Sequence, residues 1–486
     1  MRNCKTPQLA HQKTGTDLLI ESPVFGLFDD MGTGKSKTVI DAICALAQQR
    51  IINAAVIVCP NTVKSNWSDP DPLKGEIAKH GWETLVHGIY EISAGKTLFP
   101  LDTLPPCQLQ WIIVNYDSVW RGRIENWLQA FMKQYHTAMV LDESHYIKNP
   151  GSQRTRGCIR LGQLAQRRYI LSGTPITRCP LDIYSQYRFL DWNILGYRNF
   201  SSYKQDIVVF DPYGYKVNGR PVAVKSYKNM DKTLQRIAAF YRRVEKDQCL
   251  DLPAKIYTKR EVPMNEVQQK LYKQMKEKLV AEFGGQKMTA TIALTVQLRL
   301  AQISAGFLRS TNEDGHEVLT FLNSPKVQEA VELVDMHEGS AIIFFQQHAE
   351  CQMLGEGLTK AKISYYELHG KIPTDQRKDI IENFQAQARP VLLCQQLTGG
   401  IGINLTAADL VIFFSNADGW DYRAQAEDRA HRHGQTRSVT YVDLLSTNKG
   451  IRTVDHKILD NVRKKQSLAE LLIKTQEDLT TLLASL

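Results

Sequence analysis

The stretch "VFGLFDDMGTGKSKTVIDAICAL", residues 24–46, combines a short apolar run, a glycine-containing loop and a segment with helical periodicity. Gly32 and Gly34 allow the backbone amides of such a loop to face a phosphate group where the helix begins. Lys35 can then reach the β- and γ-phosphates, and Ser36 can bind Mg²⁺. The stretch therefore predicts a nucleotide-phosphate loop between a strand and a helix.

Similar apolar, β-branched runs recur along the chain, each followed by a turn signal and a helix-period segment. Continuous rather than alternating hydrophobicity is typical of strands that are buried on both faces of a parallel sheet. The runs fall into two blocks, which predicts an α/β fold with two doubly wound parallel-sheet lobes. The first block contains residues 24–28, 54–59, 111–114, 138–142 and 168–172, and the second contains residues 341–345, 391–394, 410–414 and 439–445.

The segments between and after the two blocks have a different pattern. Residues 264–283 are charged and helix-periodic, with Leu271 and Met275 four positions apart on one face. We therefore expect residues 191–323 to form helical protrusions and the connection between the lobes. The expected remaining parts are lobe 1 at residues 1–190, lobe 2 at residues 324–450 and a helical tail at residues 451–486.

A polar cluster follows the apolar run at residues 138–142, which ends on Asp142 and continues with Glu143, Ser144 and His145. Asp142 at a strand end can hold Mg²⁺, and Glu143 can orient and polarise an attacking water. Taken alone, the cluster could equally be a set of helix caps. On the same predicted sheet as the phosphate loop, it indicates the second part of one phosphoryl-transfer site.

Two further motifs can serve such a site. Ser172 and Thr174 in "LSGTPI" could connect nucleotide state to another surface by hydrogen bonding, although an ordinary turn has the same composition. In "QAEDRAHRHGQT", a helix would place Gln425, Arg429 and Arg432 on one face. Two arginines held there suit an arginine-finger role against a γ-phosphate. A solvated basic face or a phosphate-backbone contact is the alternative.

Composition narrows the class of protein. Apolar residues make up 43% and charged residues 23% of the 486 residues, as in soluble globular proteins. The chain has neither an apolar stretch of the roughly 18 residues that span a bilayer nor a signal-peptide core, so we expect an intracellular protein without a membrane partner. Nine cysteines without a C-x-x-C pair argue against a disulfide framework and a structural zinc site. The net charge of +9 modestly favours a polyanionic partner.

The motifs occur in the order of one known family. "DDMGTGKS" resembles the D-E-M-G-x-G-K-[ST] loop of the Snf2 family of superfamily 2 helicase-like ATPases, "LDESHYIKN" resembles its D-E-A-H box, and "LSGTPI" resembles its motif III. "RRVEKDQCLDLPAK" is similar to the family's R-R-x-K…L-P-x-K connector. The other matches are motif Ia at residues 57–67, Ib at 114–119, IV at 341–347, the following block at 367–384, V at 397–413 and VI at 425–436. The chain resembles a short member of the family that consists of the motor alone.

This resemblance implies two RecA-like lobes with ATP bound between them and Mg²⁺ as its cofactor. The implied nucleotide-binding residues are Gln12, near the adenine, and Gly32, Thr33, Gly34, Lys35, Ser36 and Lys37. The implied metal ligands are Ser36 and Asp142, and the implied catalytic residues are Lys35, Glu143, Arg429 and Arg432. The implied coupling residues are Ser172, Thr174 and Gln425. The implied contacts with a DNA backbone are Asn61, Lys64, Asn66, Gly400 and Asn404.

Members of the family typically track along double-stranded DNA, usually without separating its strands. We therefore expect a DNA-stimulated ATPase that translocates as a monomer on double-stranded DNA and remodels branched or forked DNA in repair, replication or recombination. In a prokaryotic or viral host it would act in the cytoplasm, at the nucleoid. A strand-separating helicase and a remodeller of a DNA-bound protein complex are the alternatives.

Four residues depart from the family pattern. Asp30 replaces the usual glutamate of the loop, and Ser144 replaces alanine or glycine in the acidic box. Tyr146 stands where arginine is common, and Asp421 replaces the asparagine of W-N-P. None of these changes removes a group that hydrolysis needs, so we expect an active ATPase.

Overall fold

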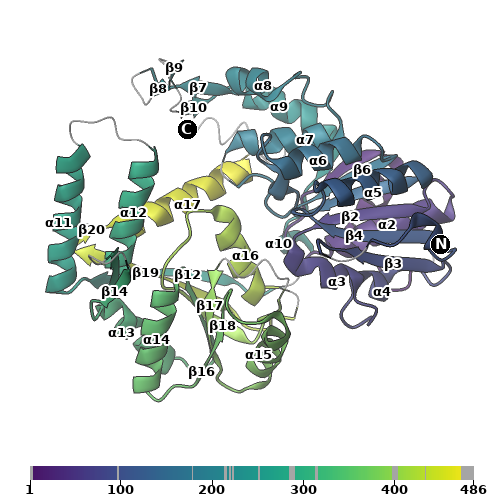
Figure 1. The fold of residues 1–486 in the computed structure, drawn as a ribbon. Helices are drawn as coiled ribbons and strands as arrows, with labels where there is room; N and C mark the ends of the chain where they lie inside the picture. Colours follow the sequence, from purple (N-terminus) through teal and green to yellow (C-terminus); the bar gives the residue numbers. More distant parts are fainter. Residues whose placement is uncertain are drawn as a thin grey trace. The chain divides into compact units, whose positions relative to one another are not determined.

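Two compact units make up the chain in this computed structural model, and each is built on one large sheet (Figure 1). Unit 1 comprises residues 1–211 and 224–251 together with residues from 467 onward, and unit 2 comprises residues 212–223 and 252–466. The structure describes residues 4–95, 98–177, 179–212, 216–217, 220–221, 224–249, 252–283, 290–311, 316–396, 403–432 and 434–471.

The sheet of unit 1 has the strand order β11-β1-β6-β5-β2-β4-β3, and its neighbouring strands are all parallel. Its strands are β1 (Val24–Leu27), β2 (Ala54–Cys59), β3 (His87–Ile92), β4 (Leu109–Asn115), β5 (Thr137–Asp142), β6 (Arg167–Leu171) and β11 (Tyr241–Arg242). Its helices are α1 (Ala10–Glu21), α2 (Lys35–Gln48), α3 (Lys64–Ser68), α4 (Glu76–His80), α5 (Gly122–Gln134), α6 (Gln153–Gly162), α7 (Ile183–Leu190), α8 (Phe200–Ile207), α9 (Met230–Ile237) and α10 (Lys246–Cys249). A separate antiparallel pair joins β7 (Val208–Phe210) to β10 (Val224–Tyr227).

Burial explains why the apolar runs of unit 1 become central strands. β2 and β4 are buried along their whole length. Alternate residues of these strands, such as Ile57 and Ile113, pack with α1 and α2 in one core cluster. The intervening residues, such as Val58 and Val114, are also fully buried. Strands buried on both faces need continuous hydrophobicity, which is the pattern that the sequence has.

The sheet of unit 2 has the strand order β12-β19-β18-β15-β17-β16, again parallel throughout, with one short antiparallel strand, β20, beside β19. Its strands are β12 (Lys255–Pro263), β15 (Ser340–Phe345), β16 (Tyr365–Leu368), β17 (Val391–Gln395), β18 (Ala408–Phe413), β19 (Val439–Asn448) and β20 (Ile451–Arg452). Its helices are α11 (Glu266–Phe283), α12 (Ala290–Ala305), α13 (Pro325–Asp335), α14 (His348–Lys360), α15 (Thr374–Ala386), α16 (Trp420–Ala430) and α17 (Val454–Leu471). Two antiparallel pairs complete it: β8 (Lys216–Val217) with β9 (Arg220–Pro221), and β13 (Phe307–Thr311) with β14 (Glu317–Phe321).

Both faces of this second sheet are covered as well. One core cluster packs α13 and α14 against residues such as Ile343 and Leu393, and another packs α15 and α16 against residues such as Phe344 and Leu392. The prediction of two doubly wound, RecA-like parallel-sheet lobes is confirmed. None of the described helices is both long and apolar enough to cross a membrane.

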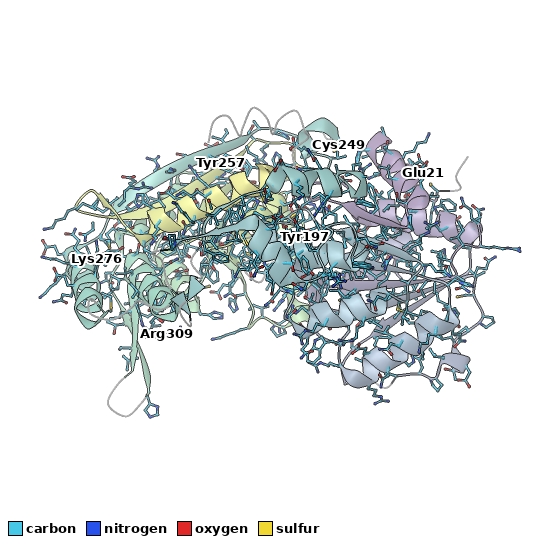
Figure 2. All side chains as sticks on the ribbon, turned by 90° about the horizontal axis from the view of Figure 1, so that it is seen from above. Glu21, Tyr197, Cys249, Tyr257, Lys276 and Arg309 are labelled. Carbon is cyan, nitrogen blue, oxygen red and sulfur yellow. The ribbon has the colours of Figure 1, made fainter. Side chains whose placement is uncertain are left out.

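The segment expected to hold helical protrusions and the connection also supplies an edge strand to each sheet. β11 pairs with β1 in unit 1, and β12 pairs with β19 over nine residue pairs in unit 2. Figure 2 labels Cys249 on α10 and Tyr257 on β12, on either side of the point where the chain leaves unit 1 for unit 2.

Helices α11, α12 and α17 form a cluster of their own in unit 2. Tyr272, Ile303, Ile458 and Val462 pack together there, and the hydroxyl of Tyr272 accepts a hydrogen bond from the backbone N–H of Val454 at 2.9 Å. The first part of the expected helical tail is thus α17, packed on the expected protrusion helices. Residues 472–486 lie outside the described residues.

Candidate nucleotide-binding site

Three of the sequence motifs lie at the carboxyl ends of strands in the sheet of unit 1. The phosphate loop follows β1, "LSGTPI" follows β6, and the acidic box begins at the end of β5. Since β1, β6 and β5 are adjacent and parallel, their carboxyl ends lie side by side. Ligands of open α/β sheets bind outside such strand ends.

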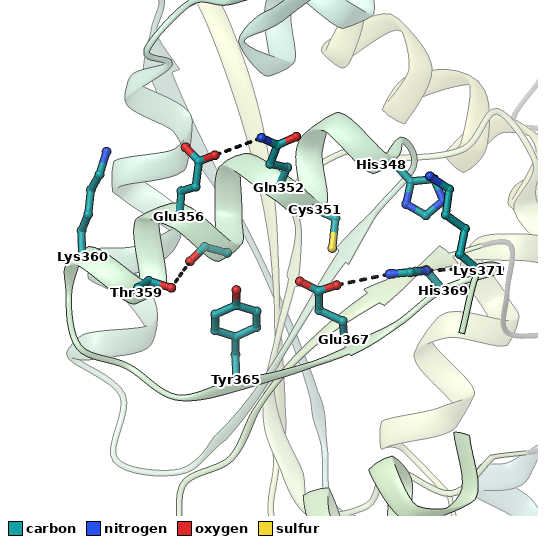
Figure 3. Close-up of a pocket in the computed structure, with 11 residues that line it drawn as sticks. His348, Cys351, Gln352, Glu356, Thr359, Lys360, Tyr365, Glu367, His369 and Lys371 are labelled. Atoms are coloured by element: carbon teal, nitrogen blue, oxygen red, sulfur yellow. Dashed lines mark hydrogen bonds and ion pairs between the residues drawn. The ribbon is translucent and has the colours of Figure 1, made fainter. Parts of the chain in front are cut away.

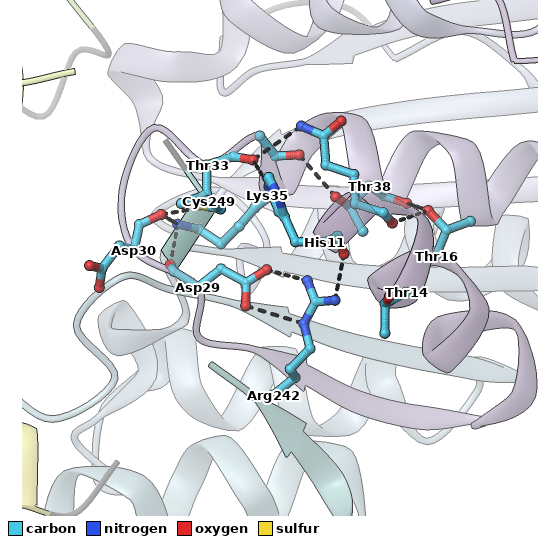
Figure 4. A network of polar contacts seen from close by, with 12 residues as sticks. His11, Thr14, Thr16, Asp29, Asp30, Thr33, Lys35, Thr38, Arg242 and Cys249 are labelled. Atoms are coloured by element: carbon cyan, nitrogen blue, oxygen red, sulfur yellow. Dashed lines mark hydrogen bonds and ion pairs between the residues drawn. The ribbon is translucent and has the colours of Figure 1, made fainter. Parts of the chain in front are cut away.

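The phosphate loop turns through two left-handed glycines. Gly32 has φ of 77° and Gly34 has φ of 89°, a conformation that residues with a side chain rarely adopt. α2 begins directly afterwards at Lys35, so its first backbone N–H groups point out of the helix end. The ammonium of Lys35 donates to the carbonyls of Asp29 at 2.7 Å and Asp30 at 3.0 Å (Figure 4). Lys35 therefore closes the loop on itself in this conformation.

Two arginines of the connector hold the start of the loop. Arg242 on β11 forms an ion pair with Asp29 at 2.5 Å and donates to the carbonyl of His11 at 2.6 Å (Figure 4). Arg243 lies 3.3 Å from the carboxylate of Asp30. Sequence reasoning noted this arginine pair only as a family match. Its position beside β1 explains why aspartates open this loop.

The other predicted nucleotide-binding residues differ in whether their side chains contact the phosphate loop or lie within α2. Gln12 is buried and donates to the carbonyl of Thr33 at 3.1 Å, so it contacts the phosphate loop itself. Ser36 lies in the first turn of α2. Lys37 is buried, and its ammonium is paired with Asp41 at 2.8 Å, within α2. Lys37 thus stabilises the helix and is not presented to a phosphate in this conformation.

Asp142 ends β5 and is held from two sides. The indole N–H of Trp67 donates to Asp142 Oδ2 at 2.9 Å, and the Tyr116 hydroxyl donates to its backbone carbonyl at 2.8 Å. Burial and the charge of Glu143 raise the pKa of Asp142 to about 6. The carboxylate of Asp142 and the hydroxyl of Ser36 are both hard oxygen ligands, the kind that Mg²⁺ prefers. The donor set therefore fits that ion.

Glu143 has a left-handed backbone, with φ of 55°, and its carboxylate lies 3.2 Å from Nδ1 of His145. Burial alone would raise the pKa of Glu143, but the hydrogen bond and charge of His145 and the charge of Lys35 outweigh it and lower the pKa. His145 in turn lies 3.3 Å from the Ser172 hydroxyl, which accepts from the backbone N–H of Thr174 at 3.1 Å. The predicted coupling residues Ser172 and Thr174 thus connect to Glu143 through one histidine.

The departures from the family pattern have structural partners. Ser144 is buried and donates to Gln186 Oε1 at 2.6 Å, which ties the acidic box to α7. Tyr146 stacks on Tyr116, with ring centroids 5.2 Å apart. Asp421 is buried in the first turn of α16. These residues stabilise the surroundings of the motifs.

Motif VI lies in unit 2 and differs from the expected single helical face. α16 ends at Ala430, so Arg432 lies beyond the helix and does not continue the face of Gln425 and Arg429. Gln425 is half-buried, whereas Arg429 is buried, with Nη1 lying 3.5 Å from Cys394 Sγ. Among the described residues, Nε and Nη2 of Arg429 have no hydrogen-bond partner.

Arg432 is half-exposed, and its Nη1 donates to the carbonyl of Ile403 at 3.4 Å. The prediction that all three side chains share one helical face was wrong, because a sequence without a glycine or proline at the end of a helix does not show where that helix stops. Of the two arginines, Arg432 is the accessible one in this conformation.

The predicted DNA contacts of motif Ia are divided. Asn61 is exposed and its Oδ1 accepts from Asn115 at 2.8 Å, and Asn66 is half-buried. Lys64 is buried, and its ammonium is paired with Glu91 at 2.8 Å. A lysine held in that way is not presented to a phosphate backbone, so this conformation does not support the expected role of Lys64.

The predicted DNA contacts of motif V are described only in part. Gly400 lies outside the described residues, as do all of residues 397–402, the first six residues of the motif. Asn404 is exposed, and its carbonyl accepts from Gln385 Nε2 at 2.6 Å.

Comparisons with known proteins agree with this arrangement. Residues 11–307 match the family described as "SNF2-related domain", and residues 325–434 match "Helicase conserved C-terminal domain". The first match alone covers more than half of the chain, so the chain belongs to the SNF2-related family, a class of helicase-like ATP hydrolases.

Individual relatives are distant and longer. An uncharacterized ATP-dependent helicase of Mycoplasma genitalium is 27% identical over 95% of this chain and 42% of its own length. A SWI/SNF-related matrix-associated actin-dependent regulator of chromatin, subfamily A-like protein 1, of Xenopus laevis is 26% identical over 85% of this chain and 39% of its own length. The SWI2/SNF2 ATPase core of Sulfolobus solfataricus, solved in complex with double-stranded DNA, aligns with 98% of this chain and 97% of that chain at 23% identity, with a TM-score of 0.43. The chain spans about two fifths of the length of these curated relatives.

Proposed function

We propose that this chain binds ATP with Mg²⁺ at the phosphate loop of unit 1 and hydrolyses it in response to DNA. The observation that carries the proposal is the convergence of Lys35, which follows β1, with Asp142 and Glu143, at the end of β5, at the carboxyl ends of parallel strands separated by β6 alone. The charge of Lys35 acts on both carboxyl groups: it offsets part of the rise that burial and Glu143 cause in the pKa of Asp142, and it contributes to the lowered pKa of Glu143, which is consistent with one shared site.

In the proposed reaction Lys35 leaves the loop carbonyls and binds the β- and γ-phosphates of ATP. Glu143, ionised because its pKa is lowered, accepts a hydrogen bond from the attacking water and orients it. Mg²⁺ held by Ser36 and Asp142 would neutralise charge on the phosphates. Gln12 and Thr33 would position the nucleotide beside the loop, as the contact between them suggests.

We propose Arg432 as the arginine that stabilises charge on the γ-phosphate during the catalytic cycle, because its side chain is only partly buried, whereas Arg429 is buried. Arg429 is proposed as a second donor, because its buried Nε and Nη2 have no hydrogen-bond partner among the described residues and would favour an anion. Ser172, Thr174 and Gln425 are proposed to couple hydrolysis to movement. The hydrogen bond between His145 and Ser172 supports the first step of that coupling.

The proposed use of this hydrolysis is translocation of a monomer along double-stranded DNA inside the cell, with remodelling of branched or forked DNA. The family membership and the net charge of +9 support a polyanionic partner. Asn61, Asn66 and Asn404 are the proposed backbone contacts within the described residues, and the exposure of Asn61 and Asn404 favours them.

A DNA panel tests this proposal. ATP hydrolysis by the purified chain is measured with duplex, forked, four-way-junction and single-stranded DNA, while gel analysis follows the strand products. The proposal predicts stimulation by duplex or branched DNA without net strand separation. Stimulation mainly by single strands together with fork unwinding would identify a strand-separating helicase instead. The absence of stimulation by any DNA, in a preparation that hydrolyses ATP, would refute the proposed partner.

A further inference from the structure

A hollow of about 640 Å³ runs in unit 2 along α14, from His348 to Lys360, and beside β16 and the residues that follow it (Figure 3). Four side chains of metal-ligating type meet there. His348 and Cys351 are three residues apart in the first turn of α14, Glu367 lies in β16, and His369 directly follows that strand. The i, i+3 spacing in a helix places His348 and Cys351 on one face. His369, the residue directly after β16, has its Nε2 3.2 Å from the carboxylate of Glu367. The hollow therefore gathers ligands from two elements.

The separations are close to those of ligands on one ion. Single ligand atoms of Cys351, Glu367 and His369 all lie within 4.8 Å of one another. Nε2 of His369 lies 3.2 Å from Oε2 of Glu367. Two such atoms on one tetrahedral Zn²⁺ would be about 3.3 Å apart, and a sulfur and a nitrogen about 3.6 Å apart, given ordinary bond lengths. The carboxylate–imidazole edge thus already has the required length, and the thiol must approach by at most about 1.2 Å.

A fourth ligand is within reach. The ring of His348 stands edge-on to the ring of His369, with centroids 4.6 Å apart and planes at 84°. His348 is half-exposed at the start of α14, so its ring can rotate without repacking the core. Cys351 and His369 are buried, with exposures of 3% and 7%, so two ligands are fixed by packing.

The charges decide which ion fits. Burial and the charge of Glu367 raise the pKa of the Cys351 thiol, so an ion has to displace its proton. A Cys351 thiolate and the Glu367 carboxylate would then together neutralise a divalent cation. Lys371, which also lines the hollow, opposes a cation and reduces its affinity. Thiolate and imidazole are ligands of Zn²⁺ and similar transition metals, whereas Mg²⁺ and Ca²⁺ take oxygen ligands.

Binding an ion requires one local exchange. In the present conformation Nδ1 of His369 accepts a hydrogen bond from the backbone N–H of Lys371 at 3.3 Å, so Nε2 carries the proton that faces Glu367. An ion at Nε2 displaces that proton while Nδ1 takes one up, so the imidazole changes tautomer and stays neutral, and the Cys351 thiol gives its proton to solvent. The long bond from Lys371 is then lost. A single weak hydrogen bond is a small term beside metal–ligand bonds.

We propose that His348, Cys351, Glu367 and His369 form a binding site for a transition-metal dication, with Zn²⁺ as the ion that best matches the ligands. The site is separate from the phosphate loop, which belongs to unit 1. Its ion fastens the start of α14 to the end of β16. The lack of a C-x-x-C pair does not reveal this site, because "HAEC" and "ELH" each supply only half of its ligands. This inference does not rest on the proposed ATPase function.

Cobalt substitution tests the site directly. The full chain, freed of metals with a chelator, is titrated with Co²⁺ while the sulfur-to-cobalt charge-transfer band and the visible ligand-field bands are recorded. We expect tetrahedral bands that saturate at one equivalent, disappear on addition of Zn²⁺ and persist in excess Mg²⁺. Cys351→Ser should lose the charge-transfer band. Cys107→Ser, which changes a half-buried cysteine of unit 1, is the matched control and should keep it.

A second variant protects the test against misfolding of Cys351→Ser. Glu367→Gln keeps the size of a half-exposed side chain and should weaken Co²⁺ binding at least about ten-fold, since loss of even an outer partner of a metal ligand has that effect. Zn²⁺ should also raise the melting temperature of the unsubstituted chain and of Cys107→Ser, but not of Glu367→Gln at the same concentration. The absence of a cobalt band in the unsubstituted chain, a band that survives in Cys351→Ser, or unchanged affinity in Glu367→Gln would each overturn the proposal.

Discussion

Replacing Arg242 with methionine should release the start of the phosphate loop. The Asp29 carboxylate is 1% exposed and the Arg242 side chain 13% exposed, and their closest atoms are 2.5 Å apart. Methionine fills a similar volume without charge, so Arg242→Met leaves the buried carboxylate of Asp29 without its ion-pair partner. The substitution also removes the hydrogen bond that Arg242 donates to the carbonyl of His11. The loop, β1 and the start of α1 should therefore all be affected.

The size of the effect follows from burial. Removing one partner of a buried ion pair destabilises a protein by about 3–5 kcal/mol, because the other charge stays desolvated. The neighbouring pair between Arg243 and Asp30 offers a matched control, since Asp30 is 29% exposed and the closest atoms are 3.3 Å apart. Partly exposed pairs contribute about 0–1 kcal/mol. Arg243→Met should therefore destabilise unit 1 several-fold less than Arg242→Met.

Hydrogen–deuterium exchange of the amides in β1, α1 and α2 reports the local free energy of opening. Nucleotide affinity, measured with a fluorescent ATP analogue, should fall with Arg242→Met because the loop loses its anchor. The double variant Asp29→Asn with Arg242→Met removes both charges and should recover at least about 1 kcal/mol, as expected for coupled partners. Equal effects of Arg242→Met and Arg243→Met, or purely additive effects in the double variant, would refute the reasoning.

Three further predictions use other parts of the structure. Arg432→Ala should lower ATP turnover by about 10³-fold with little change in melting temperature, whereas Arg429→Ala should lower both because Arg429 is buried in unit 2; an equal loss of stability in the two variants would contradict this. Gly34→Ala should weaken ATP binding and destabilise unit 1 by about 1–2 kcal/mol, since φ of 89° is left-handed, and calorimetry measures both quantities. Burial alone would raise the pKa of Glu427, but the charges of Arg423 and Lys255 outweigh it and lower the pKa below 4.5. The ionised Glu427 therefore contributes its full stability above pH 4.5, and this contribution is lost as the pH falls through the folded-state pKa. Glu427→Gln should be less stable than the unsubstituted chain at neutral pH, and its free energy of unfolding should fall less as the pH is lowered. Parallel acid-unfolding curves of the two proteins would argue against this reasoning.

The core strands and the phosphate loop could be predicted because their signals are local. β2, β4, β15 and β18 are continuous apolar runs, and burial on both faces of a parallel sheet requires such runs. The loop is marked by glycines at the two positions that need a left-handed backbone. The acidic box could be placed beside the loop because its strand, β5, belongs to the same parallel sheet as β1.

The edge strands could not be predicted in the same way. β12 has the sequence "KIYTKREVP" and is exposed along most of its length, so hydrophobicity does not mark it. Its place is determined by backbone pairing with β19, more than 170 residues away in the chain, as the partners Lys255 and Val439 show. β11 spans only two residues. Pairing with a distant strand leaves no local signal in either segment.

The partners of the site residues were also beyond the sequence. Arg242 lies more than 200 residues from Asp29, and Trp67 lies 75 residues from Asp142. Lys64 has the residue type of a phosphate contact, but the structure uses it as the buried partner of Glu91. Such contacts depend on which strands become neighbours, and that order is a property of the whole sheet.

ATP binding and hydrolysis measured side by side on Glu143→Gln test the central claim, that Lys35, Asp142 and Glu143 form one hydrolysis site. The substitution keeps the shape of the side chain and removes the charge that orients the attacking water. We predict ATP affinity within a few-fold of the unsubstituted chain and single-turnover hydrolysis slower by about 10²–10⁴-fold. Lys35→Ala, as the companion, should lose affinity itself. Near-normal turnover by Glu143→Gln with duplex DNA present would contradict the account.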